Sequence, residues 1–134
     1  MKKKQDPVQF VICQAQGQPG VNFTGTVCLN IWGERADDAV SVCGGGTLSA
    51  FFGAVDRVIL KQLGFAPTLT SYSLRALHKP GQPVTKNAIA RVTVHASDNG
   101  NTTRSTAEST DIIAASLVAY IQAINNLYHK RSVK

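Results

Sequence analysis

The sequence has no apolar run that approaches the roughly 18 consecutive residues needed to cross a membrane. Its basic start, Met1-Lys2-Lys3-Lys4, is not followed by the apolar segment that a secretory signal requires. From these two absences we expect neither a membrane-spanning protein nor a secretory leader, and we expect a cytoplasmic location.

Cysteine is scarce as well. The three residues Cys13, Cys28 and Cys43 are widely spaced, and no C-x-x-C motif occurs. A disulfide framework or a zinc site needs more closely spaced ligands, and the three histidines form no close pair either. We therefore expect no metal and no cofactor, and we expect the thiols to pack within strands.

Charge of one sign is concentrated at the ends of the chain. Lysine and arginine number 14 against 8 acidic residues, and six of the 14 lie within residues 2–4 and 130–134. Nucleic-acid binding would need basic residues on the folded body with aromatic residues among them, and Tyr72 and Arg91 alone are too little. We expect solvated tails and neither a nucleic acid nor a membrane as partner.

What the chain does contain is a hydrophobic fraction of 43% in 134 residues, enough for the core of one domain. Alternating apolar residues over 8–12 and 27–31, and a short run over 39–43, predict three strands in an antiparallel meander. Residues 14–20 and 33–38 are rich in polar residues and turn formers, so we expect loops there.

A glycine run, Gly44-Gly45-Gly46, ends this pattern, and the apolar period then changes from 2 to 3.6. Thr47 is the expected N-cap of a helix, and Gly64 is its expected C-terminal stop. The expected buried stripe of this helix consists of Leu48, Phe51, Phe52, Val55, Val58, Ile59 and Leu63.

The second half repeats this order. Extended segments are expected over 68–77, 90–96 and 102–107, with a proline-containing loop over 78–86. The dipeptide Asn99-Gly100 predicts a tight hairpin between the last two segments.

A final helix is predicted from about Asp111 to Tyr128, with Ser109 or Thr110 as its N-cap. Small residues on this helix let another element pack closely against it. They are Ala114, Ala115, Ala119 and Ala123.

The order strand-strand-strand-helix thus occurs twice, which predicts an α+β fold of two βββα units. We expect a single domain over residues 1–134, with halves of about 8–64 and 65–129 and basic tails at 1–7 and 130–134.

The segment from Val42 to Ala50 is similar to the glycine-rich helix start in the C-terminal regulatory domain of 2-isopropylmalate synthase. Residues 109–116, Ser-Thr-Asp-Ile-Ile-Ala-Ala-Ser, are similar to that domain's last helix, and residues 72–74 and 90–94 fit its middle strands. The resemblance covers about residues 8–128. The chain departs from the family's second G-x-G segment, where it has Ser-Thr-Ala.

The resemblance implies a βββα-βββα regulatory module that dimerises and binds an end-product amino acid. That amino acid is leucine in 2-isopropylmalate synthase and isoleucine in citramalate synthase. The catalytic part of the family is a metal-dependent (β/α)₈ barrel, an acyltransferase, and 134 residues are too few for one. The chain is then a regulatory part or relative of such an enzyme. The alternative is a dimerisation or protein-interaction domain of the same fold that binds no effector.

A glycine-rich loop entering a helix offers backbone N–H groups to a carboxylate, and Asp111 is a candidate for an effector's ammonium group. The resemblance places apolar pocket residues on both helices and on one strand. The expected effector-binding set is Gly44, Gly45, Gly46, Leu48, Phe51, Val55, Leu69, Thr110, Asp111 and Ile112. A core role for the helical residues and a capping role for Asp111 stay open. We expect no catalytic residue in the chain.

Overall fold

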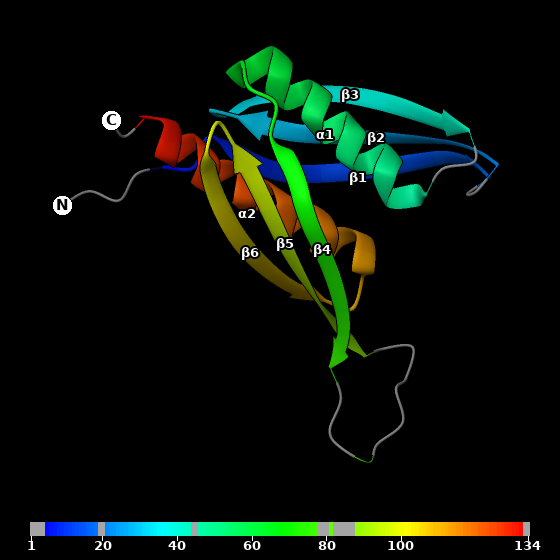
Figure 1. Cartoon of the computed structure of the whole chain (residues 1–134). Coiled ribbons are helices and arrows are strands. Elements are labelled where there is room, and N and C mark those ends of the chain that lie inside the picture. Colours follow the sequence, from blue (N-terminus) through cyan, green and yellow to red (C-terminus); the bar gives the residue numbers. More distant parts are fainter. Residues whose placement is uncertain (1–4, 19–20, 44–45, 78–80, 82–87, 133–134) are drawn as a thin grey trace. The chain divides into compact units, whose positions relative to one another are not determined.

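The computed structural model describes residues 5–18, 21–43, 46–77, 81 and 88–132. Two three-stranded antiparallel sheets are each followed by a helix, so the predicted α+β class and the two βββα units are confirmed (Figure 1). The chain divides into two compact units, Met1–Ala66 and Pro67–Lys134.

The first unit contains β1 (Val8–Gln18), β2 (Asn22–Ile31), β3 (Glu34–Cys43) and α1 (Thr47–Leu63). Its strands pair in sequence order, and α1 packs against β2 and β3. Every second residue of β2 is buried because that face of the sheet meets the helix. Its buried side chains include Val8, Phe23, Val27, Leu29, Ile31, Phe51, Val55, Val58, Ile59 and Phe65.

The second unit contains β4 (Thr68–Leu77), β5 (Ile89–Asp98), β6 (Asn101–Ser109) and α2 (Ile112–Ser132). The helix α2 packs against β5 and β6. Buried residues alternate along β5, as they do along β2. The core of this unit is formed by Val92, Val94, Ala96, Ala115, Leu117, Ala119, Tyr120, Ile124 and Leu127.

Two predicted loops are wrong. Residues 14–18 belong to β1 and pair with Thr26 back to Asn22, and residues 34–38 belong to β3. Both stretches lie in strands at the edges of their sheet, where one side of the backbone has no neighbour and the side chains are largely exposed. Residues 14–18 are all exposed, and the half-buried positions of 34–38 are Ala36 and Asp38, so neither stretch shows an alternation of large apolar residues.

The helix boundaries also differ from the predictions. Gly46, not Thr47, is the N-cap of α1, whereas Gly64 ends the helix in a left-handed conformation as expected. The helix α2 continues to Ser132 instead of ending at Tyr128. Arg131 lies in the last turn and binds Asp98 at 2.7 Å, so this residue is part of the folded unit and not of a tail. The expected loop over 78–86 lies outside the described residues, except for Gly81.

Each unit has a two-residue hairpin turn with positive φ at both positions. The φ angles are 53° at Trp32 and 86° at Gly33, and 52° at Asn99 and 86° at Gly100. These are the angles of a type I′ turn, which matches the twist of the flanking strands. The hairpin predicted from Asn99-Gly100 is confirmed, and the equivalent turn at Trp32 had no comparable signal. Among the described residues, no helix is long and apolar enough to span a membrane.

Candidate functional site

The start of α1 carries the first group of predicted site residues. Gly46 has an extended backbone, with φ -76° and ψ 153°, and no described side chain caps the helix. The first turn of α1 also contains no acidic residue. The leading N–H groups of the helix are therefore without a side-chain acceptor, and the positive end of its dipole is not neutralised locally. Gly44 and Gly45 lie outside the described residues.

The three predicted pocket residues of α1 differ in exposure. Leu48 is half-buried, whereas Phe51 is 2% and Val55 0% exposed. The ring of Phe51 meets that of Phe23 edge to face, with centroids 5.8 Å apart and planes at 80°. Phe51 and Val55 thus belong to the core of the first unit. Their role as pocket walls stays a prediction, and Leu48 is the best placed of the three to meet a ligand.

Gly25 explains how α1 comes so close to β2. A Cβ atom at this position would lie 3.1 Å from the Ala50 Cβ and 3.1 Å from the Phe51 Cδ1. The missing side chain is what makes room for the Phe51 ring. Sequence analysis did not single out Gly25, because a glycine within a strand carries no signal for what packs against it.

The second group of predicted residues lies at the start of α2. Asp111 Oδ1 accepts hydrogen bonds from the N–H groups of Ile113 at 2.9 Å and Ala114 at 3.2 Å. Asp111 is therefore the N-cap of α2, in place of the predicted Ser109 or Thr110. No described residue donates to its second oxygen, Oδ2. That atom remains an acceptor for an ammonium group.

Thr110 and Ile112 flank this cap and are both exposed, Ile112 by 43%. A hydrogen-bonded chain behind them was missed by sequence analysis. The Tyr72 hydroxyl lies 2.8 Å from Ser116 Oγ, and Ser116 Oγ donates to the Ile112 carbonyl at 2.8 Å. This chain ties the first turn of α2 to β4. It also places Tyr72 on the face of the sheet that meets the helix, whereas Arg91 lies on the other face.

Leu69 lies at the other end of the second sheet. It pairs with Ala96 of β5, whereas Ser109, next to the start of α2, pairs with Ala90. Six residues of strand at about 3.3 Å each separate the two places by roughly 20 Å. Within the second unit the structure thus gathers Thr110, Asp111 and Ile112 but not Leu69.

One carboxylate has a clearly shifted pKa, and it lies away from the predicted site. The Lys61 ammonium, 2.8 Å from Asp38 Oδ2, and the Ala39 N–H lower the pKa of Asp38 from 3.8 to about 2. Arg57 adds a further contact at 3.3 Å. This cluster joins β3 to α1, so its role is structural. No group of three metal-ligating side chains occurs among the described residues.

Comparison with known proteins places these features in a family. The model of the LeuA allosteric (dimerisation) domain matches residues 1–128. The chain belongs to this family. It is 33% identical to the 2-isopropylmalate synthase of Clostridium kluyveri over 107 residues, which cover 80% of the chain and 19% of that protein.

Other 2-isopropylmalate synthases are similar to it. The enzyme of Ruminiclostridium cellulolyticum is 31% identical over 119 residues, covering 89% of the chain and 22% of that protein. A probable 2-isopropylmalate synthase of Methanopyrus kandleri is 28% identical over 113 residues, covering 84% of the chain and 21% of that protein. The chain spans about a fifth of the length of these relatives. The family gives the LeuA-type chain a regulatory or dimerisation role.

Proposed function

We propose that this LeuA-type chain is the regulatory, amino-acid-binding domain of an enzyme of the 2-isopropylmalate synthase type. It mediates feedback inhibition by leucine, or by isoleucine, in branched-chain amino acid biosynthesis in the cytoplasm. The family match over residues 1–128 carries this proposal. Residues 1–134 act as one regulatory domain together with a catalytic (β/α)₈ barrel, either on a longer chain or on a partner chain.

The start of α1 supports a site for the effector's carboxylate. It offers N–H groups that no described side chain caps, and Leu48 lies half-buried beside them. The start of α2 supports a site for the ammonium group through the second oxygen of Asp111. We propose each helix start as an effector contact within its own unit, with Ile112 as an apolar contact at the start of α2.

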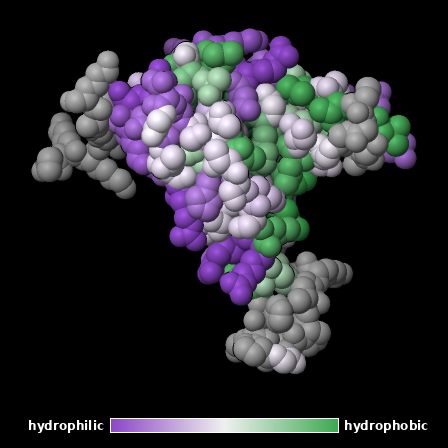
Figure 2. Space-filling model, viewed as in Figure 1, coloured by the Kyte–Doolittle hydropathy of each residue, from purple (hydrophilic) through white to green (hydrophobic). Residues whose placement is uncertain are grey.

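The surface of the second unit supports dimerisation. The helix α2 covers β5 and β6, and the helix-facing side of β4 keeps apolar residues at the surface, with Leu74 46% exposed. Figure 2 shows the opposite side of this sheet, the side turned away from α2, where hydrophilic and intermediate residues prevail. We propose a homodimer in which a second copy of the chain covers the helix-facing side of β4.

A thermal-shift titration with leucine and isoleucine tests the effector. Binding at 100 times the dissociation constant adds about 2.7 kcal/mol, which raises the Tm of a domain of this size by roughly 5 °C. Gly46→Val is the sharpest variant, because its φ is negative and no atom lies within 4 Å of the added Cβ. It should lower the Tm of the free protein only slightly, because valine is a poorer N-cap than glycine, and it should lose the shift. D-leucine is the matched control ligand.

A domain that dimerises without an effector is the second candidate. In place of the family's second glycine segment, residues 105–107 lie within β6, and Ser105 accepts a hydrogen bond from Asn126 Nδ2 at 3.3 Å. This segment is therefore part of the strand, and Ser105 packs against α2. A dimer by light scattering that gives no shift with saturating leucine or isoleucine would favour this candidate, and a monomer would contradict both.

A further inference from the structure

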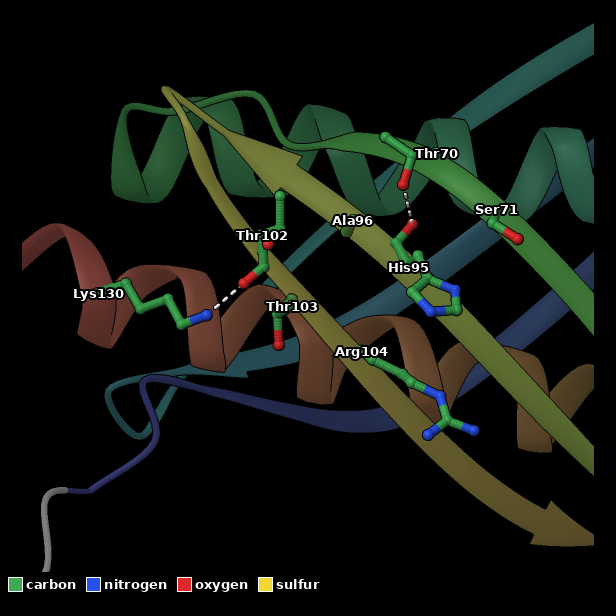
Figure 3. A pocket seen from close by; sticks show the side chains of 8 residues that line it. All are labelled: Thr70, Ser71, His95, Ala96, Thr102, Thr103, Arg104 and Lys130. Atoms are coloured by element: carbon green, nitrogen blue, oxygen red, sulfur yellow. Dashed lines mark hydrogen bonds between the residues drawn. The ribbon is translucent and has the colours of Figure 1, made fainter.

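The outer face of the second sheet, the face turned away from α2, is polar along most of its length. Val92, Val94 and Ala96 of β5 are buried under the helix, so the alternate residues of β5 and their partners point outward. The pairing register aligns Ser71, His95 and Arg104 in one row across the three strands. Figure 3 shows the side chains of this row on the same side of the sheet.

A hollow of about 600 Å³ lies over this row. Hydroxyl-bearing residues line it together with the row itself, among them Thr70 and Thr102. Thr70 Oγ1 donates to the His95 carbonyl at 3.1 Å, at the β-bulge of β4. Lys130 of α2 reaches the Thr102 carbonyl at the edge of β6 (Figure 3). The volume lies within the range of small-molecule sites, about 300–1,000 Å³.

The charges of this outer face are unbalanced at the hollow. Arg104 is exposed, and among the described residues it has no hydrogen-bond or ion-pair partner. Glu108 is the one acidic residue on the outer face of the described strands, and it is bound to Arg91 at 2.7 Å. The row of Thr93 and Thr106 separates this ion pair from the row of His95 and Arg104. The hollow therefore offers a guanidinium, an imidazole, an ammonium and hydroxyls, and no carboxylate is among the described residues that line it.

We propose that this hollow binds the phosphate group of a small ligand, with Arg104 as its principal contact. The planar fork of a guanidinium fits two oxygens of a phosphate, and the hydroxyl of Ser71 and the ring of His95 donate from the same side. Free phosphate and a phosphate monoester share this chemistry. The site lies on the side of the sheet away from α2, so it is independent of the effector site proposed above.

Nucleic acid is a poorer match to this surface. Sequence-tolerant binding of single strands relies on aromatic side chains for base stacking. Tyr72 is the one Phe, Tyr or Trp residue in the described strands of the sheet, and it lies on the face that meets α2. The outer face contacts phosphate without a platform for bases.

Amide NMR of the full chain tests the proposal. Inorganic phosphate is titrated at constant ionic strength, and a titration with sodium chloride is the control. We expect saturable shifts at His95, Thr102 and Arg104. Arg104→Gln should weaken the apparent affinity about tenfold or more, as loss of a charged hydrogen-bonding pair does. Arg91→Gln is the matched control, because it removes the same charge from the same face, and its affinity should stay within about twofold.

Three further probes identify the ligand class: glycerol phosphate, a short single-stranded oligonucleotide and poly-glutamate. Saturable binding of phosphate or glycerol phosphate at the hollow supports the proposal. Saturable binding of the oligonucleotide or poly-glutamate alone overturns it, as does equal weakening by Arg104→Gln and Arg91→Gln, or the absence of saturable shifts. If circular dichroism shows that Arg104→Gln has a clearly lower Tm than the unchanged chain, Arg104→Lys is used in its place. That variant keeps the charge, loses the fork and is expected to bind less tightly than the unchanged chain.

Discussion

Asp38 of β3 and Ser105 of β6 occupy corresponding places in the two units, each opposite a fully buried valine of the middle strand. Asp38 binds Lys61 and Arg57 of α1 through its charge. Ser105 is bound by the amide of Asn126 from α2, a neutral contact. The same place between sheet and helix is thus held by an ion cluster in one unit and by a neutral hydrogen bond in the other.

The two units also differ in which side of the helix–sheet interface carries the large side chains. In the first unit a glycine of the middle strand, Gly25, lies against a large helical residue, Phe51. In the second unit the corresponding strand position is Val92, and the buried face of the helix carries Ala115, Ala119 and Ala123. Bulk lost on one side of each interface is supplied on the other, because a helix and a sheet must fill the space between them to native density.

The largest expected effect comes from removing this bulk. Phe51→Ala should destabilise the first unit by about 3–5 kcal/mol, since no side chain at Gly25 can fill the cavity. Gly25→Val should cost about 1–3 kcal/mol through overpacking. The double variant recreates the arrangement of the second unit and should cost less than the sum of the two. Denaturant unfolding with hydrogen exchange read separately in each unit measures these values, and strict additivity would contradict the complementarity.

A smaller effect, with a distinct pH dependence, is expected from the ion cluster. Asp38→Asn should cost about 1 kcal/mol at pH 7, a modest value because the side chains of Lys61 and Arg57 are 62% and 56% exposed. The pKa of Asp38 is lowered in the folded state, so its contribution is present above pH 3.8 and is lost as the pH falls through about 2. The difference in the free energy of unfolding between the variant and the unchanged chain should therefore disappear as the pH falls from 3.8 to about 2.

Ser105→Ala is the control for this pH series. A hydroxyl does not titrate in this range, so any loss of stability should be the same at pH 7 and pH 2.5. A gap for Asp38→Asn that stays constant over the same range would show that charge plays no part in the contact.

Effects of the same size or smaller are expected at the two hairpin turns. Left-handed backbone suits Asn99, but it costs about 1 kcal/mol for most other side chains. Asn99→Ala should therefore destabilise the chain by about 1 kcal/mol. Trp32→Asn places the favourable residue in the first turn and should stabilise the chain by about 0.5 kcal/mol. Thermal unfolding of both variants checks the opposite signs, and a loss of stability in Trp32→Asn would mean that the contacts of the indole outweigh the backbone strain.

The sequence was most informative where one side of an element is buried. β2, β5 and the apolar stripe of α1 could be predicted from their period, because burial of one face imposes that period on the residues. The edge stretches 14–18 and 34–38 could not, because their backbones are held by pairing with β2, the side chains of 14–18 are exposed, and the half-buried positions of 34–38 are Ala36 and Asp38, which give no large-apolar alternation.

For the candidate site, too, local features could be predicted from the sequence and tertiary contacts could not. A helix start after a glycine run and an aspartate before α2 are local features, and the sequence by itself determined both, together with the repeated βββα order. Only the tertiary structure decided that Asp111 is the cap, that Phe51 is enclosed against Gly25, and that Arg104 lies beside His95 with no counter-ion in the described part of the chain. Those outcomes depend on which residues of distant segments are brought together. Strand pairing and helix packing decide this, and the local composition of a segment does not encode it.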